Sequence, residues 1–260
     1  MRVTFLGSGT STGVPVIGCR CEVCQSPDPR DRRLRPSIRI EWDGASILVD
    51  TSTDLRAQAL VHGIRRVDAV LYTHAHADHV LGLDDLRTFN WLQRGAIPIY
   101  GSAETLADLS RSFWYVFENV QVGGGKPAVL PRAVDSSFEF LGRRVVPVPV
   151  LHGSLPILGY RIGGLAYLTD ASVIPETSRP LLRGLDTLVL AAPREQPHPT
   201  HMHLARALEE ARLVAARRTF LTHIGHDLLH ARVSAGLPPG VELAYDGLVL
   251  EIEDRDEVVF

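Results

Sequence analysis

The sequence has no long run of apolar residues and no excess of either charge. Of its 260 residues, 45% are hydrophobic and 22% are charged, and 27 Lys and Arg face 30 Asp and Glu for a formal net charge of -3. This balance excludes the strong positive potential on which bulk binding to nucleic acids or membranes depends. No stretch is long enough for a membrane span, and residues 1–7 lack the apolar segment of a secretory signal. We therefore expect a cytoplasmic protein with neither a membrane nor a nucleic acid as its partner.

Cysteine is also scarce, and the three cysteines lie close together as Cys19, Cys21 and Cys24. An odd number of cysteines in one short stretch argues against a disulfide framework and for a metal site with thiolate ligands. A cluster of free thiols is the alternative. A thiolate site would also need a fourth ligand, which this stretch of sequence does not supply.

The sequence contains no internal repeat, but one local arrangement occurs four times. An apolar strand is followed by a side chain that can bind a metal in Val70–His74, Val148–His152, Ala166–Asp170 and Phe220–His223. Rigid strands that carry ligands at their ends suit a preorganised site at one edge of a sheet assembly. We therefore expect these four segments to converge.

The densest group of such side chains is His74, His76, Asp78 and His79. Imidazole and carboxylate groups together are typical ligands of Zn, Mn, Fe or Ni. Because alternate side chains of an extended segment share a face, His74 and His76 can hold one ion while Asp78 and His79 turn toward a second. The alternative is a polar loop in which the histidines occur by coincidence.

Periodicity and turn residues predict an alternation of strands and helices. We expect strands at Arg2–Leu6, Ser37–Trp42, Ala45–Val49, Val67–Tyr72, Ala96–Tyr100, Ser137–Leu141, Arg144–Val150, Leu158–Ile162, Leu165–Leu168, Thr187–Leu190 and Arg218–Leu221. We expect helices at Asp54–His62, Gly82–Gln93, Ser102–Phe117 and Leu204–Ala216, the last capped by Thr200. The stretch Glu118–Ser136 is expected to be a surface connection, and Val241–Ala244 is expected to form a hairpin with Leu248–Ile252.

The spacing His74-x-His76-x-Asp78-His79, with single ligands farther along, resembles the metallo-β-lactamase superfamily over nearly the whole chain. The resemblance implies one domain over residues 1–260, of the α/β (α+β) class, folded as a four-layer αβ/βα sandwich with a two-metal site at one edge. It implies that His74, His76 and His152 hold the first metal, that Asp78, His79 and His223 hold the second, and that Asp170 bridges them. Asp50 matches an aspartate that supports the site without binding a metal.

The cysteines indicate a narrower group within this superfamily. Gly18-Cys19-x-Cys21-x-x-Cys24, directly after the segment Ser8–Gly13, is similar to PhnP-type phosphodiesterases, the phosphoribosyl 1,2-cyclic phosphate hydrolases of phosphonate breakdown. This resemblance implies a structural zinc held by the three thiolates and by His226, in a loop at about residues 18–36, and it implies a homodimer. For the turn at Gly7–Gly13, a tight strand-to-loop connection and a direct ligand contact both remain open.

A further histidine group, His198, His201 and His203, precedes the helix predicted at Leu204–Ala216. In PhnP-like enzymes a histidine of this region protonates the leaving oxygen, and a sugar alkoxide leaves poorly without a proton. We favour His201 as this general acid because it lies just after the predicted cap. His198 is the second candidate and His203 the third. The predicted catalytic residues are thus His201 and Asp78, which is also a predicted metal ligand.

The resulting hypothesis is a dinuclear phosphodiesterase that hydrolyses a small cyclic phosphodiester such as 5-phosphoribosyl 1,2-cyclic phosphate through a hydroxide bridging the metals. We expect Mn or Zn in the active site and a single structural Zn. One alternative is a tRNase Z-like RNA 3′ endonuclease, although the sequence shows no basic arm for tRNA. The other alternative is a PqqB-like carrier without catalysis, for which a loss of ligands would be expected.

Overall fold

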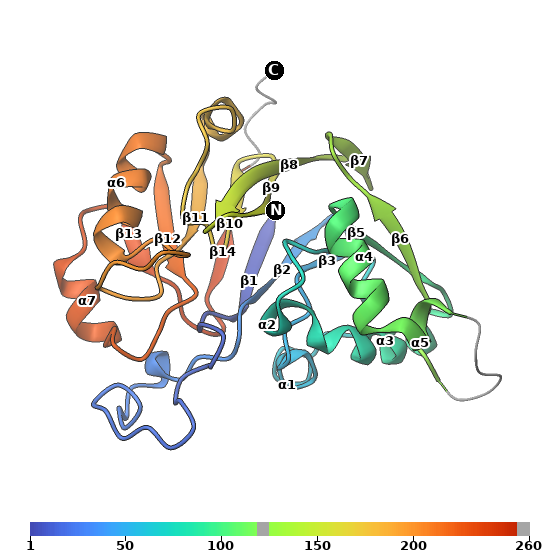
Figure 1. The fold of residues 1–260 in the computed structure, drawn as a ribbon, viewed down its shortest axis with the longest axis horizontal. Coiled ribbons are helices and arrows are strands. Elements are labelled where there is room, and N and C mark those ends of the chain that lie inside the picture. Colours follow the sequence, from blue (N-terminus) through green and yellow to red (C-terminus); the bar gives the residue numbers. More distant parts are fainter. Residues whose placement is uncertain (119–124, 254–260) are drawn as a thin grey trace.

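The computed structural model describes residues 1–118 and 125–253. Within these residues, two mixed β-sheets of seven strands each form the centre of the molecule (Figure 1). The first sheet has the order β14 (Val249–Glu251), β1 (Arg2–Gly7), β2 (Ser37–Trp42), β3 (Ala45–Val49), β4 (Ala69–Leu71), β5 (Ile97–Gly101) and β6 (Val129–Ala133). The second has the order β13 (Val241–Leu243), β12 (Arg218–Thr222), β11 (Thr187–Ala191), β10 (Leu165–Leu168), β9 (Leu155–Ile162), β8 (Arg143–His152) and β7 (Phe138–Phe140).

The helices cover the outer faces of the two sheets. They are α1 (Leu55–Val61), α2 (Ala77–Val80), α3 (Leu86–Gln93), α4 (Ala103–Ser112), α5 (Trp114–Phe117), α6 (Leu204–Val214) and α7 (His230–Gly236), with 3₁₀ segments at Pro29–Asp31, Leu81–Asp85 and Arg179–Leu182. In Figure 1, α6 and α7 lie at the left, and α1 to α5 lie at the lower centre and the right. None of the helices in the described ranges combines the length and the apolar character that a membrane span requires.

Three apolar cores hold these layers together. The central core joins the two sheets, for example through Phe5 of β1 and Phe220 of β12, whose ring centroids lie 6.3 Å apart. A second core packs α6 and α7 on the second sheet, and a third packs α1, α3 and α4 on the first. Burial of apolar area on both faces of each sheet accounts for the layered arrangement. The predicted four-layer αβ/βα sandwich is confirmed.

In each sheet, one part is parallel, and this part determines where the site lies. Strands β3 to β6 run parallel to one another, as do β10 to β13. Parallel neighbours bring their carboxyl ends to one edge of a sheet, where ligands of open α/β sheets characteristically bind. The two edges meet, because Leu158 N of β9 donates to Thr73 O, which follows β4, over 3.0 Å.

The predicted terminal hairpin is wrong. Strand β13 pairs in parallel with β12, whereas β14 pairs antiparallel with β1 in the other sheet. The connection between them carries Asp246, whose carboxylate accepts from Ser8 N over 2.8 Å and from Leu34 N over 2.7 Å. The turn at Asp246 thus passes the chain from one sheet to the other instead of folding it back.

The stretch Glu118–Ser136 is also different from the prediction. Its residues Val129–Ala133 form β6, an edge strand that pairs in parallel with β5. Residues 119–124 of this stretch lie outside the described part of the chain. Helix α7 was not predicted at all. Its sequence, His230–Gly236, is short and contains no strongly periodic apolar run.

Candidate functional site

Five strand ends converge on one cluster of histidines and aspartates. Asp50 directly follows β3, His152 is the last residue of β8, and His223 directly follows β12. His74 follows β4, and Asp170 follows β10. His76 precedes α2, which itself carries Asp78 and His79. The four strand-to-ligand segments that the sequence predicts to converge therefore do so.

The ligand atoms of this cluster fall into overlapping groups, within each of which they lie no more than 4.8 Å apart. The groups are His74 with His76 and His152, Asp78 with His79 and His223, His74 with His79 and Asp170, and His152 with Asp170 and His201. The first two groups coincide with the two sets of metal ligands that the resemblance implies. All seven predicted ligands of the dinuclear site are thus brought together.

Asp170 lies between the two sets. Its Oδ2 is 3.1 Å from His79 Nε2, and its Oδ1 is 3.1 Å from His223 Nε2. The carboxylate also faces the first set, because it shares a group with His74. A shared anionic ligand is what two neighbouring cations require, since they would otherwise repel each other. The position of Asp170 suits the bridging role predicted for it.

The donor atoms fit metal ions on chemical grounds. His74 Nε2, His79 Nε2 and His223 Nε2 are buried and form no hydrogen bond among the described residues, although the last two lie 3.1 Å from the Asp170 carboxylate. Buried polar atoms in native proteins almost always have a partner. Three such nitrogens in one cluster with two carboxylates are explained if metal ions bind them. Imidazole nitrogens and carboxylate oxygens suit Zn and Mn.

Metal ligands must be deprotonated, and the electrostatics favour that form at Asp170 and His74. At His79 they do not, because burial would lower its pKa but the charges of Asp170 and Asp50 outweigh burial and raise the pKa well above its usual value. Burial would raise the pKa of Asp170, but the nearby charges of His223 and His79 outweigh it and hold that pKa well below its usual range. Burial lowers the pKa of His74 well below its usual value and favours the neutral imidazole. A carboxylate and a neutral imidazole are the forms that bind a divalent cation.

Asp50 supports the cluster from behind. Its carboxylate is fully buried and accepts from Thr73 N over 2.8 Å and from Thr73 Oγ1 over 2.8 Å. His79 Nδ1 lies 2.7 Å from Asp50 Oδ2, so it donates a proton there and leaves Nε2 free to face the cluster. Sequence analysis did not identify Thr73, which stabilises this aspartate. Its place between a buried strand and His74 was the available signal.

Three residues of the site have an unusual backbone conformation. Asp50, Asp170 and His223 have φ values of 63°, 56° and 59°. Residues other than glycine seldom adopt this left-handed region, and strain of this kind persists where the surroundings hold it in place. Each of the three lies where a strand ends and the chain turns. Three of the residues that form or support the cluster therefore have a strained backbone.

Among the three histidines before α6, His201 reaches the cluster. Its Nε2 lies 3.0 Å from Asp170 Oδ1, and burial lowers its pKa. His198 lies behind it, with Nδ1 3.5 Å from His201 Nδ1. His203 is the N-cap residue of α6, and its side chain does not cap the helix.

The predicted cap at Thr200 is wrong. Its carbonyl instead accepts from His152 Nδ1 over 2.6 Å, which fixes the ring so that Nε2 faces the cluster. The Thr200 hydroxyl contacts His201 Nδ1 at 3.0 Å. Thr200 thus orients two histidines of the site, a role that sequence analysis missed because the residue resembles an ordinary helix cap.

The cysteines form a second cluster with His226. Nδ1 of His226 lies 3.3 Å from Sγ of Cys19, 3.5 Å from Sγ of Cys21 and 3.7 Å from Sγ of Cys24. The backbone N–H of Cys24 lowers the pKa of Cys21 to about 6, which favours the thiolate. Burial raises the pKa of Cys24 to about 11. Three sulfur atoms and one imidazole nitrogen that lie within 4.8 Å of one another suit a tetrahedral zinc ion.

The segment Ser8–Gly13 contacts Ile224, which lies between His223 and His226 in the chain. Ser8 O accepts from Ile224 N over 2.8 Å, and Thr10 N donates to Ile224 O over 3.1 Å. The segment therefore lies against the residues that follow His223. Its contacts account for a structural role at this place.

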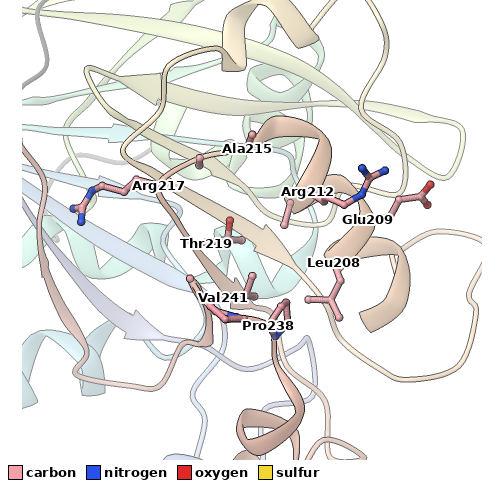
Figure 2. A pocket seen from close by; sticks show the side chains of 12 residues that line it. Leu208, Glu209, Arg212, Ala215, Arg217, Thr219, Pro238 and Val241 are labelled. Atoms are coloured by element: carbon pink, nitrogen blue, oxygen red, sulfur yellow. The ribbon is translucent and has the colours of Figure 1, made fainter.

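A groove of about 500 Å³ lies apart from both clusters, between α6 and β13 (Figure 2). Leu208 and Arg212 of α6, Pro238 and Val241 line it, as Figure 2 shows. Its lining contains no histidine or cysteine. The groove is therefore distinct from the candidate site.

Comparison with known proteins identifies the fold family. Residues 45–224 match the model of the beta-lactamase superfamily domain, and this range includes all seven predicted ligands of the dinuclear site. The chain belongs to the beta-lactamase superfamily. The three cysteines and His226 lie outside the matched range.

Solved structures narrow the relationship within the superfamily. A new diphosphatase from the PhnP family is 47% identical to this chain with a TM-score of 0.91, and the match covers 97% of this chain and 98% of that one. The predicted PhnP-like character is confirmed. Human tRNase Z, short form, is 23% identical with a TM-score of 0.71, covering 97% of this chain and 100% of that one. At that identity the likeness shows the fold alone.

The curated relatives that match this chain include longer proteins, and their names differ from that of the PhnP-family structure. Octanoyltransferase of Porphyromonas gingivalis is 39% identical over 259 residues, which are 98% of this chain and 52% of that protein. Coenzyme PQQ synthesis protein B of Methylobacterium radiotolerans is 31% identical over 171 residues, which are 60% of this chain and 54% of that protein. The chain thus spans about half the length of these relatives.

Proposed function

We propose that this protein is a dinuclear metal-dependent hydrolase that cleaves a small phosphodiester, with a cyclic ribose phosphate such as 5-phosphoribosyl 1,2-cyclic phosphate as the substrate. The observation that supports this most directly is the position of Asp170 between two three-residue sets of metal-binding side chains. The 47% identity to a diphosphatase of the PhnP family supports phosphoryl transfer to water as the reaction class.

In this proposal His74, His76 and His152 hold the first metal, Asp78, His79 and His223 hold the second, and Asp170 is shared. Bound divalent metals would supply an activated water and neutralise charge on the phosphoryl oxygens. Asp78 contributes to catalysis through its place in the second set. Asp50 and the Thr200 carbonyl keep His79 and His152 in the tautomer that directs Nε2 inward.

His201 acts as the general acid. It approaches the cluster from the loop before α6, and its Nε2 is 3.0 Å from Asp170. With substrate bound, this nitrogen would transfer its proton to the ribose oxygen that leaves phosphorus. The structural role in the proposal belongs to Cys19, Cys21, Cys24 and His226, which would bind one zinc ion in a loop at about residues 18–36 of a single domain.

A second candidate reaction is the hydrolysis of a diphosphate, because the PhnP-family structure is that of a diphosphatase. The same residues would serve both reactions, since each transfers a phosphoryl group to water. Octanoyl transfer is not proposed, because the chain spans only 52% of the relative with that name. The RNA 3′ endonuclease and the non-catalytic carrier are the rival functions.

The test is turnover by protein reconstituted with Mn or with Zn. The panel contains bis(4-nitrophenyl) phosphate, 4-nitrophenyl phosphate, a ribose 1,2-cyclic phosphate, an alkyl diphosphate and a simple lactone. We expect cleavage of the diester and of the cyclic phosphate. Cleavage of the diphosphate alone would select the second candidate. Cleavage of the lactone alone, or bound metal without turnover of any substrate, would refute the proposal.

The proposal also includes a homodimer, as the resemblance implies, and no RNA substrate. Sedimentation equilibrium of the metal-loaded protein checks the first point. Binding to tRNA that weakens steeply with salt would contradict the second and favour the endonuclease.

A further inference from the structure

One short segment supplies a residue to each of the two clusters. His223 and His226 both follow β12, only three positions apart, and His223 faces the aspartate-containing cluster while His226 faces the cysteines. The conformation of residues 223–228 therefore sets the geometry of both clusters. Whatever holds this segment in place acts on both.

His223 differs from the other buried histidines of its cluster in how its ring is held. The Nδ1 atoms of His79 and His152 bond to Asp50 and to Thr200 O, and that of His74 contacts Thr73 Oγ1 at 3.0 Å. His223 Nδ1 has no hydrogen-bond partner in the described ranges. Because no neighbour fixes this ring from behind, its direction depends on its backbone, which has a φ of 59°.

Backbone bonds of Ile224 and Gly225 hold the start of this segment, and one buried guanidinium group holds its carbonyls farther along. Arg33 Nη1 donates to Gly225 O over 2.8 Å, and Nη2 donates to Leu228 O over 2.8 Å. The Arg33 side chain is 0% exposed, so these bonds are shielded from water. Charge-assisted bonds from the rigid guanidinium fork fix geometry better than bonds from a flexible amine. Arg33 thus joins two carbonyls that lie on either side of His226.

Arg33 is itself held in place through both its side chain and its main chain. Nη2 also donates to Asp31 Oδ1 over 2.7 Å, and Asp31 accepts from the N–H of His230 over 2.8 Å. The main chain of Arg33 pairs with Val14 through two bonds of 2.8 Å. Val14 packs against Cys24 in the small apolar core of the cysteine loop. The arginine therefore connects the cysteine loop to the segment after β12.

We propose that Arg33 is a positioning residue that holds residues 223–228 so that His223 binds the second metal and His226 binds the structural zinc. The inference rests on the metal roles in the proposed function, but its test does not depend on the substrate. Loss of the guanidinium fork weakens metal binding at both clusters together, although Arg33 touches neither metal site directly.

The test compares Arg33→Lys with Arg161→Lys. Arg161 is a matched control because it too is buried, and its Nη1 donates to Leu181 O and Arg183 O over 2.7 and 2.9 Å, away from both clusters. Metal affinity is measured by calorimetry for the dinuclear site, and the cysteine site is followed by the thiolate-to-cobalt absorption of the Co-substituted protein. Melting temperature reports general damage.

We expect Arg33→Lys to weaken metal binding at the Asp78, His79 and His223 set by about tenfold and to alter the cobalt spectrum. Arg161→Lys lowers the melting temperature and changes neither metal readout. With phosphodiester substrates, Arg33→Lys lowers kcat, and added metal restores much of it. Equal metal affinity and identical cobalt spectra in Arg33→Lys and the unaltered protein would overturn the inference.

Asp31→Asn is the second variant, for use if Arg33→Lys does not fold. An asparagine keeps the shape of this side chain but removes the charge that anchors Arg33. We expect a smaller loss of affinity at both clusters. A loss at one cluster only would contradict a shared role for Arg33. If the unaltered protein binds fewer than two metals at the dinuclear site, the proposed function fails as well, which separates the two failures.

Discussion

The two clusters are built in opposite ways. The histidine and aspartate cluster takes its residues from strand ends in both sheets and from α2, over the whole range from Asp50 to His223. The cysteine cluster takes three of its four residues from positions 19–24 of one loop, the blue loop at the lower left of Figure 1. The buried apolar residues of that loop are only Val14, Val23 and Cys24 among those described.

This difference predicts how each cluster depends on metal. Strand ends in packed sheets, supported by Asp50, the Thr200 carbonyl and Arg33, hold side chains in place before any metal binds, so the first cluster is preorganised. A loop with so small a core lacks that support, and binding energy of a zinc ion becomes folding energy of the loop. Metal at the first cluster should therefore matter for chemistry, and metal at the second for stability.

The largest effect is expected from Asp170→Asn in the first cluster. An asparagine removes the negative charge between the two ligand sets, and we expect phosphodiesterase activity to fall about a thousandfold, equal to about 4 kcal/mol. Steady-state kinetics with bis(4-nitrophenyl) phosphate measures the change. The control is Asp186→Asn, a buried aspartate paired with Arg217 outside the cluster, which should cost stability only. Full activity and metal content in Asp170→Asn would refute the dinuclear proposal.

A smaller loss is expected from His201→Gln. If His201 protonates the leaving oxygen, activity toward a ribose cyclic phosphate falls about a hundredfold, while metal content is unchanged. The loss should be much smaller with 4-nitrophenolate, which leaves without a proton. His203→Gln, at a position whose side chain makes no cap bond, is the control. An equal loss for both leaving groups would assign His201 to metal binding with His152 and Asp170 instead.

Asp50→Asn tests whether the Asp50 carboxylate holds the His79 ring in the orientation that binds a metal. If the amide nitrogen of an asparagine faced His79 Nδ1, two donors would oppose each other. The ring would then turn or carry its proton on Nε2, which could no longer bind a metal. We expect metal affinity at the second set to fall about tenfold, as for other supporting carboxylates. Calorimetric titration measures it. An unchanged affinity would mean that strand geometry alone holds His79.

The same contrast explains what the sequence could predict. The ligands at strand ends could be found because a buried strand is recognisable from its apolar residues and the polar residue after it stands out, as at His152 and His223. The terminal hairpin could not be predicted correctly. Its turn has the residues of a local reversal, but Asp246 binds Ser8 and Leu34, which lie 238 and 212 positions away along the chain, and directs the two strands to different sheets.

The sequence also did not reveal the residues that hold the predicted metal ligands in position. Thr200 has the sequence features of a helix cap, yet its carbonyl binds His152 from a distant strand. Arg33 lies among exposed arginines of a charged loop, and nothing local separates it from them, although it is fully buried. Such roles depend on which segments meet in the fold, which the local sequence does not record.

The smallest effect on chemistry is expected from Cys21→Ala in the second cluster. Removal of one sulfur ligand should release zinc and lower the melting temperature by about 5 °C, equal to about 2 kcal/mol for a domain of this size. Activity of the folded fraction should stay within about twofold, because Arg33 still holds residues 223–228 through Gly225 O and Leu228 O. Thermal unfolding and activity at saturating metal measure the two effects. An unchanged melting temperature with lost activity would assign the cysteines to the chemistry and remove the contrast between the clusters.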